Sequence, residues 1–574
     1  MSMKPNRIVR RFLLSLVTAA CSGDDSTEPP RPKALTPIGG VQQGVVGTEL
    51  PAALVVLVTD ARVRGMPGIA VTWQASAGTL STSTVSTDAN GYASTRWTLG
   101  TVAGPQYVTA SVNAMVPVTF NVTALPGPPT FVSVLPSSLR LEPGTVTQFF
   151  AQVGADQYGN LWPPDAVVWS ATDSIVAPVT VGGQMTATRA GKALVRGTVG
   201  GMTGESTVEV TARWRAIGAG GLHTCALDEL GYAFCWGDNS AGQLGVMNRE
   251  RDSLPVPVVG DRRYTALSVG DAHACGLTSE YEAFCWGQNG VGQLGIGTLV
   301  PASSATPMRI GALRFAFISA AGRHTCGLTT GFLGTFGIAY CWGWEGEGQL
   351  GNGNVTLTRQ PAPQLVHGGL TFRAISGGGS HTCAITNANK PYCWGNDYEG
   401  QIGDANTAEP RYRPVPTAVG GDLAVNSIAA GGAHTCASTI VDGRTLCWGS
   451  NAFGQVGDGS WPWQLTPTPP IGVPSLSAVA LGFWHTCGLT AEGEAWCWGR
   501  NTDGQLGDGS TLTKSVATRV ETSIRFTSLS GGLAHTCGVT ANGEAYCWGA
   551  GASGELGIGA RIQRTSPTLV SNPR

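Results

Sequence analysis

Histidine and cysteine, two residue types that can bind metals or act as nucleophiles, recur together in a fixed frame along the sequence. The stretch His223–Gly245 reads HTCALDELGYAFCWGDNSAGQLG, so that a His-x-Cys unit is followed by a second cysteine in Cys-Trp-Gly. The frame occurs seven times, with the pairs Cys225/Cys235, Cys275/Cys285, Cys326/Cys341, Cys383/Cys393, Cys436/Cys447, Cys487/Cys497 and Cys537/Cys547. This frame is compatible with three chemistries: disulfides, free buried thiols and metal sites.

The separation within each pair favours disulfides. It grows where the intervening turn is longer, as with the GFLGTFGIAY insertion between Cys326 and Cys341. Insertions that spare the strand positions place the two cysteines opposite each other on antiparallel strands, where Cα atoms lie about 4.5–5.5 Å apart, within disulfide range. Seven identical sets of three ligands with no fourth residue are a poor zinc prediction. We therefore predict seven disulfides and no metal site.

The histidines follow the same frame, since seven of the eight precede the first cysteine of a pair by two residues. A residue repeated in every copy is predicted to be structural, through a hydrogen bond to a neighbouring backbone group. The eighth, His367 in QLVHGG, is expected in a solvent-exposed turn. With no unique histidine, no Gly-x-Ser-x-Gly motif and no glycine-rich phosphate loop before a helix, we predict no catalytic residue, no cofactor and no enzyme activity.

The elements that position these residues form a repeat. The copies begin 50, 51, 57, 53, 51 and 50 residues apart, a periodicity typical of a propeller or solenoid. Alternation along each hairpin puts large apolar residues and tryptophan on one face, and histidine, cysteine and small residues on the other. Such sheets must stack face to back, and a ring leaves no end face exposed. We predict seven four-stranded blades, with RAIGAG, HTCAL, YAFCWG and VPVVG as the strands of the first.

Two cysteine-free β modules precede the repeats, so the whole chain is predicted to be all-β. Residues 39–125 contain VTWQASAGTLS and TDANGYASTRWTLG and resemble the group 1 bacterial Ig-like domain. Residues 126–211 contain VSVLPSSLRLEPGTVTQFFAQVGADQYGN and resemble the group 2 domain. Short alternating strands separated by turn signals predict two β-sandwiches. Because neither module has histidine or clustered carboxylates, we interpret both as spacers, with a self-standing adhesive role as the alternative.

The N-terminus carries an export signal. Four basic residues and the apolar run FLLSLVTAA precede Cys21. Small residues directly before a cysteine resemble a bacterial lipoprotein signal, which implies cleavage after residues 1–20 and a lipid on Cys21, although Thr18 stands where that pattern usually has leucine. Ser22 then favours outer-membrane sorting. Residues 21–38 are polar and proline-rich, as in a flexible tether. The alternative is an ordinary secretory signal cleaved nearby.

The composition argues against nucleic-acid binding. Charged residues make up 13% of the chain and the formal net charge is −2, unlike a surface that neutralises phosphates. We therefore expect no nucleic-acid partner. The expected partner is another protein or a polysaccharide, and the chain is expected to be a monomer.

The repeat itself, AGRHTCGLT…AYCWG…GQLGNG and its copies, resembles the regulator of chromosome condensation repeat family over residues 212–574, most clearly from residue 214. The resemblance implies a seven-bladed β-propeller whose loops bind other proteins. The two cysteines of each copy depart from the family pattern and suit an exported protein. The founding member is a guanine-nucleotide exchange factor for a nuclear GTPase. An exchange-factor-like role is therefore an alternative, although an anchored propeller would not meet such a partner.

Aromatic residues outside the repeat frame point to a binding surface. In a four-stranded blade, the loops joining strands 1–2 and 3–4 emerge on one face, here called the loop face, and the 2–3 turns emerge on the other, the turn face. The loop face is predicted to carry Trp344, Phe453, Trp461, Trp463 and Trp484. Exposed tryptophans are common at binding hot spots. Alternatively, SWPW is a proline-rich loop plug, and Arg249–Asp252 is a second candidate or a solvated charge run.

From these observations we expect an exported, lipid-anchored protein of the bacterial cell envelope, at the outer membrane or cell surface. Its Ig-like stalk would present the propeller as a protein-interaction or adhesion scaffold. Carbohydrate binding through the exposed tryptophan loops is one alternative, which the chemistry of the partner would distinguish from protein binding. The exchange-factor role is another, which the localisation of the protein would distinguish from both.

Overall fold

The computed structural model describes residues 30–40, 42–248, 250–331 and 337–573. The predicted signal and Cys21 lie outside the described residues. Across the described ranges the fold is all-β, and the single helical segment is a 3-10 turn at Pro164–Ala166. None of the helices described has the length and apolar character needed to span a bilayer.

The first Ig-like module is a β-sandwich. One sheet has the order β1(Ala34–Ile38), β3(Leu54–Thr59), β7(Tyr92–Thr95), and a second has the order β2(Gln42–Val45), β10(Val118–Leu125), β9(Gly104–Ser111), β4(Ala70–Ala75), β6(Thr84–Ser86). A short ribbon pairs β5(Thr79–Leu80) with β8(Trp97–Thr98). Trp73 and Trp97 are buried in its core.

The second Ig-like module has the same architecture class. Its largest sheet has the order β12(Ser138–Leu141), β18(Met202–Val210), β17(Gly191–Val199), β15(Val168–Ala171). Two ribbons pair β11(Val132–Leu135) with β14(Phe150–Val153) and β13(Val146–Gln148) with β16(Gln184–Thr186). Phe149 and Met185 are buried at its centre among valines and alanines. The alternating burial of β17 and β18 is what a one-sided core produces.

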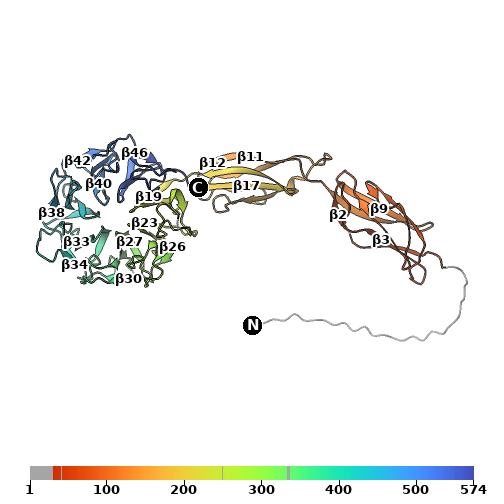
Figure 1. Ribbon diagram of the computed structural model, residues 1–574, viewed down its shortest axis with the longest axis horizontal. Helices are drawn as coiled ribbons and strands as arrows, with labels where there is room; N and C mark the ends of the chain where they lie inside the picture. Colours follow the sequence, from red (N-terminus) through yellow and green to blue (C-terminus); the bar gives the residue numbers. More distant parts are fainter. Residues whose placement is uncertain (1–29, 41, 249, 332–336, 574) are drawn as a thin grey trace, which may run out of the picture. The chain divides into compact units, whose positions relative to one another are not determined.

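The repeats form seven four-stranded antiparallel sheets arranged in a ring (Figure 1). Blades 1 to 3 are β19(Trp214–Ala219), β20(His223–Asp228), β21(Ala233–Gly237), β22(Asp252–Pro257); β23(Ala266–Val269), β24(His273–Leu277), β25(Ala283–Gln288), β26(Ser303–Arg309); and β27(Phe315–Ala320), β28(His324–Thr329), β29(Ala339–Trp344), β30(Arg359–Leu365). Blades 4 and 5 are β31(Phe372–Gly377), β32(His381–Thr386), β33(Pro391–Asn396), β34(Tyr412–Ala418); and β35(Val425–Ala430), β36(His434–Thr439), β37(Thr445–Ser450), β38(Trp463–Thr468). Blades 6 and 7 are β39(Ala478–Leu481), β40(His485–Leu489), β41(Ala495–Gly499), β42(Lys514–Arg519); and β43(Phe526–Gly531), β44(His535–Thr540), β45(Ala545–Gly549), β46(Arg564–Leu569).

The register of the central hairpin agrees with the sequence-based prediction. In blade 1, Cys225 lies opposite Cys235, and His223 lies opposite Gly237. The outer strand β22 begins at Asp252, four residues before the predicted VPVVG, because a bulge between Cys235 and Gly237 lets Asp252 pair with Gly237. Gly237 has φ +106°, and a Cβ there would lie 2.5 Å from the Leu222 carbonyl oxygen, so the bulge requires glycine.

Adjacent blades stack face to back, as predicted. Trp286 and Phe284 on one face of blade 2 pack against the Cys225–Cys235 face of blade 1. The ring closes in the same way, since Trp236 of blade 1 packs against Cys537 and Cys547 of blade 7. The tryptophan of every Cys-Trp-Gly unit is fully buried: Trp236, Trp286, Trp342, Trp394, Trp448, Trp498 and Trp548. Each such indole removes roughly 150–250 Å² of surface from water, which makes these joints the main core of the propeller.

Candidate binding face

Each blade contains one disulfide, which joins the two central strands. Every one of these cysteines is fully buried. The bonds join Cys225 to Cys235, Cys275 to Cys285, Cys326 to Cys341, Cys383 to Cys393, Cys436 to Cys447, Cys487 to Cys497, and Cys537 to Cys547. The cysteines are therefore covalently paired, as predicted, and each bond holds together the two central strands of its blade.

The paired strands lie closer together than the sequence-based estimate. Their Cα–Cα distances are 4.0–4.1 Å, below the spacing of about 4.5–5.5 Å expected of unlinked neighbours. Blades 2 and 5 show the arrangement: Cys285 lies opposite Cys275 on β24, and Cys447 lies opposite Cys436 on β36. The two central strands are therefore closely paired at this position.

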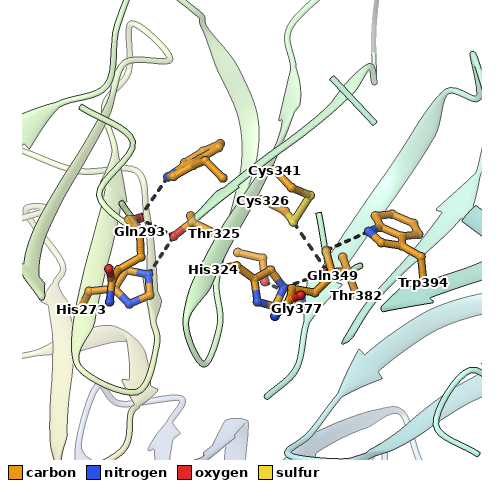
Figure 2. Close-up of a disulfide and its surroundings, with 12 residues drawn as sticks. His273, Gln293, His324, Thr325, Cys326, Cys341, Gln349, Gly377, Thr382 and Trp394 are labelled. Carbon is orange, nitrogen blue, oxygen red and sulfur yellow. Dashed lines mark hydrogen bonds between the residues drawn. A yellow bond between two sulfur atoms is a disulfide. The ribbon is translucent and has the colours of Figure 1, made fainter. Parts of the chain in front are cut away.

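The repeated histidine is held by a hydrogen-bond relay between blades (Figure 2). Nε2 of His273 lies 2.8 Å from Oγ1 of Thr325 in the next blade. The Thr325 hydroxyl donates to the carbonyl of Gln293 at 2.8 Å, and the Trp342 indole N–H donates to the same carbonyl at 3.0 Å. Since the hydroxyl hydrogen is used, Thr325 accepts from histidine, and Nε2 carries the proton. The prediction of a backbone partner for histidine is wrong, because a threonine hydroxyl fills the position.

The relay recurs at six of the seven joints, and burial keeps the histidines neutral. The other five pairs are His324/Thr382, His381/Thr435, His434/Thr486, His485/Thr536 and His535/Thr224. Burial lowers the pKa of each of the seven repeat histidines from 6.5 to about 3 or 4. A neutral histidine fixed in one tautomer is a structural group, as its repetition predicted. His367 is exposed, which also agrees with the prediction.

The joint between blades 1 and 2 departs from this pattern. Ala274 replaces the threonine, and both ring nitrogens of the buried His223 lack a hydrogen-bond partner among the described residues. The Gln243 carbonyl there accepts the Trp286 indole N–H at 3.1 Å.

The loop face brings two of the predicted aromatic residues together. Phe453 of blade 5 and Trp484 of blade 6 are in edge contact, with ring centroids 5.5 Å apart. Phe483 contacts Trp484 at 4.7 Å, and the Arg500 guanidinium lies 5.8 Å from the centre of the Phe453 ring. We call Phe453, Phe483, Trp484 and Arg500 the aromatic cluster.

The other predicted residues lie apart from this cluster. The Trp344 ring, in blade 3, is covered by Arg323 at 5.0 Å. Trp461 and Trp463 flank Pro462 and are 52% and 48% exposed, so the SWPW segment leaves both indoles accessible and does not act as a plug. The second candidate, Arg249–Asp252, extends into residue 249, outside the described residues.

Arg251 is not part of a free charge run. Its Nε lies 3.1 Å from Oδ1 of the buried Asp238, and the following Asp252 is buried at the start of β22. The interpretation of this segment as solvated charges is therefore wrong for the buried Asp252, whereas Arg251 is 52% exposed and pairs with Asp238 from the surface.

Sequence reasoning did not identify Phe483, Arg500, Arg323 or Asp271 on the loop face. Each replaces a smaller or uncharged residue found at the same position in other copies, as Phe483 does for Gly432. Comparison of the seven copies with one another would have provided that signal.

A channel of about 220 Å³ lies at the centre of the ring, at the loop-face end of the innermost strands. Its wall is mainly glycine, alanine and serine from the innermost strands, together with Asp271, Phe483 and Leu533 from the 1–2 loops. It therefore opens beside the aromatic cluster, because Phe483 belongs to both.

The structure has seven four-stranded blades around a channel, each with one internal disulfide, and two Ig-like sandwiches before them. This arrangement defines a seven-bladed β-propeller protein. Sequence comparison agrees with this class. Two family models described as Regulator of chromosome condensation (RCC1) repeat match the chain, one over residues 214–243, 264–293, 372–401, 425–455, 477–505 and 526–555, the other over 231–277, 282–328, 337–385, 391–438, 492–539 and 542–574. The chain belongs to the regulator of chromosome condensation repeat family. Residues 50–124 match the group 1 bacterial Ig-like domain and residues 128–211 the group 2 domain.

Curated relatives share the repeats over part of their length. The ultraviolet-B receptor UVR8 of Arabidopsis thaliana is 28% identical over 250 residues, 43% of this chain and 55% of the relative. The probable E3 ubiquitin-protein ligase HERC6 of Homo sapiens is 30% identical over 259 residues, 44% of this chain and 25% of the relative. The match thus spans about half or less of these relatives.

Solved structures show the same fold. Prp20p from Saccharomyces cerevisiae, in a study of its binding to Gsp1p and histones, aligns with a TM-score of 0.53 and 24% identity over 60% of this chain and 87% of that one. Human WBSCR16 aligns with a TM-score of 0.52 and 23% identity over 58% of this chain and 89% of that one. At these identities the likeness extends to the fold alone.

Proposed function

We propose that this protein is an exported, lipid-anchored envelope protein whose propeller binds another protein through its loop face. The observation that carries the proposal is the aromatic cluster together with the half-exposed Trp461 and Trp463. Water-accessible aromatic and arginine side chains on a rigid support are the residues that dominate protein interfaces. The disulfides and inter-blade relays keep that support rigid, so little conformational entropy is lost on binding.

The N-terminal segments support the location. A basic, apolar and cysteine-terminated leader directs lipid attachment at Cys21, and the two Ig-like modules serve as a stalk. Metabolic labelling with a radioactive fatty acid tests the anchor. Label should enter the wild-type chain and be absent from Cys21→Ala, whereas equal labelling of both would refute attachment at Cys21.

Affinity capture tests the binding role. The bait is the oxidised mature chain, incubated with envelope and medium fractions of the native organism. A protein held by the wild type should be lost with Phe453→Ala/Trp484→Ala or Trp461→Ala/Trp463→Ala. Tyr281→Ala is the matched control, because Tyr281 is an equally exposed aromatic residue, at 52%, on the turn face. Equal capture by all baits would exclude the loop face.

Carbohydrate binding is the second candidate. Two half-exposed indoles separated by a single proline offer flat apolar surfaces on which sugar rings could stack. Polysaccharide retained by the wild type but not by Trp461→Ala/Trp463→Ala would favour this function over protein binding.

A further inference from the structure

A closed ring of backbone hydrogen bonds surrounds the mouth of the channel on the loop face. One amide of each blade donates to a carbonyl of the next at 3.0–3.3 Å, and the donors are Gly221, Asp271, Gly322, Gly379, Gly432, Phe483 and Leu533. The blades approach so closely here that a Cβ on Gly322 would lie 2.4 Å from the Gly379 carbonyl oxygen, and one on Gly432 would lie 2.4 Å from that of Phe483. The crowding accounts for glycine in four of the seven copies.

Three copies nevertheless carry a side chain at this crowded position: Asp271, Phe483 and Leu533. All three line the channel. In a repeat protein the shared residues build the support, and departures at a position that favours glycine require another reason. Their common location at one opening indicates that they contact something outside the ring.

The Asp271 carboxylate is available to pair with a positive charge. Its carboxylate has no hydrogen-bond or ion-pair partner among the described residues, although its side chain is open to the solvent of the channel. The surrounding wall raises the pKa of Asp271 to about 6, with Arg323 acting in the opposite direction. Arg323 itself lies over the Trp344 ring. An accessible carboxylate that no side chain of the protein pairs can form a charged hydrogen bond with an incoming cation.

The size of the channel limits what can enter. Its volume of about 220 Å³ equals that of about seven water molecules at ~30 Å³ each. A space of this volume accommodates one extended side chain. Phe483 and Leu533 provide apolar contact for the methylene groups of such a side chain. The Phe483 and Trp484 rings are in contact, with centroids 4.7 Å apart, so the apolar surface extends to the aromatic cluster.

We propose that the channel mouth receives one lysine or arginine side chain of a protein partner, which pairs with Asp271 while an adjacent apolar residue of that partner contacts the aromatic cluster. The inference rests on the proposed protein-binding function and names the chemistry that the loop face recognises. Long basic side chains suit the site because their stems are apolar and their ends are charged.

A random linear peptide library displayed on phage, selected on the oxidised full chain, tests this proposal without the natural partner. The enriched peptides should share a lysine or arginine next to an aromatic or aliphatic residue. Asp271→Asn should weaken a selected peptide about tenfold or more, as expected for loss of a charged hydrogen bond. Asp271→Lys should select acidic peptides instead. Glu492→Gln, an exposed carboxylate on the turn face, is the control and should change nothing.

Three results would overturn the inference: no enrichment, enriched peptides without a basic residue, or equal affinity for wild type and Asp271→Asn. Peptides that bind without a basic preference but are lost with Phe453→Ala/Trp484→Ala would leave the proposed function intact and remove only the role of Asp271. Failure of the affinity capture alone would instead count against the proposed function. Unchanged thermal midpoints of the variants would show that folding is not the cause.

Discussion

At the joint between the first two blades, Ala274 leaves the relay of His223 incomplete. Restoring it with Ala274→Thr should stabilise the protein, because the new hydroxyl can donate to the Gln243 carbonyl and accept from Nε2 of His223. A satisfied buried hydrogen bond contributes about 0.5–1.5 kcal/mol. Urea unfolding of the oxidised chain measures the change.

The opposite substitution at an intact joint is the control. Thr325→Ala leaves His273 without its acceptor and should destabilise the chain by about 1–3 kcal/mol. If Ala274→Thr instead lowers stability, the threonine methyl group does not fit at this joint, and the relay is not the reason for threonine in the other copies.

The residue scale also shows what the sequence could and could not predict. Opposed cysteines follow from a separation that grows only where the intervening turn is longer, so Cys225 and Cys235 could be paired in advance. The partner of His273 could not, because Thr325 lies 52 positions away in another blade and meets it only once the ring has set the distance between sheets. Asp271 was missed because its signal appears only when the seven copies are compared with one another, where it replaces glycine.

At the scale of the element, each disulfide fixes one hairpin. Replacing both Cys383 and Cys393 by alanine should cost up to about 3 kcal/mol, since the bridge closes a short loop in the unfolded chain. The substitution also removes sulfur atoms that pack in the core cluster of Trp448 of the next blade. Unfolding monitored by hydrogen exchange should show the greatest loss of protection in β32 and β33.

A second blade provides the comparison for this prediction. The Cys487–Cys497 pair has the same separation of 10 residues, so its removal should cost about as much, and the two losses should add because the blades are separated. Unchanged stability after loss of both pairs would mean that blade stacking alone holds the hairpins.

Element boundaries were predictable where alternation is strict. The pairing of Cys225 with Cys235 followed from the pattern, whereas the start of β22 did not, since Asp252 joins the sheet only through the bulge at Gly237. Here the bulge shifts the pairing by two residues, since Cys235 pairs with Val256 and Gly237 with Asp252, and such a shift is not visible in hydrophobic periodicity.

At the scale of the whole molecule, the ring closes without a strand shared between its first and last blades. Each sheet consists of four consecutive strands. The joint between blades 7 and 1 is made by the same contacts as the others, including the His535–Thr224 pair at 2.8 Å and the Leu533 amide on the Gly220 carbonyl at 3.0 Å. The stability of the propeller is therefore a property of seven similar joints, each with one buried histidine.

Acidification should act on all seven joints together. The histidines have folded pKa values of about 3 or 4, below their ordinary 6.5, so the unfolded chain binds protons first as pH falls. Stability present above pH 6.5 should therefore be lost progressively down to pH 4. A smaller set of carboxyl groups acts in the opposite sense, because burial raises the pKa of Asp228, Asp271 and Asp397 to about 6 and also raises that of Glu555.

The histidines outnumber these carboxyl groups, and each net proton is worth about 1.4 kcal/mol per pH unit. The loss between pH 6 and 5 should then reach several kcal/mol, comparable with the total stability of about 5–15 kcal/mol typical of a folded protein. Hydrogen exchange of the intact chain at several pH values measures it, and residues 39–211, which have no histidine, are the internal control. Because exposed surface charges would destabilise both regions alike, equal acid sensitivity of the Ig-like modules and the propeller would show that the buried histidines do not set the stability of the ring.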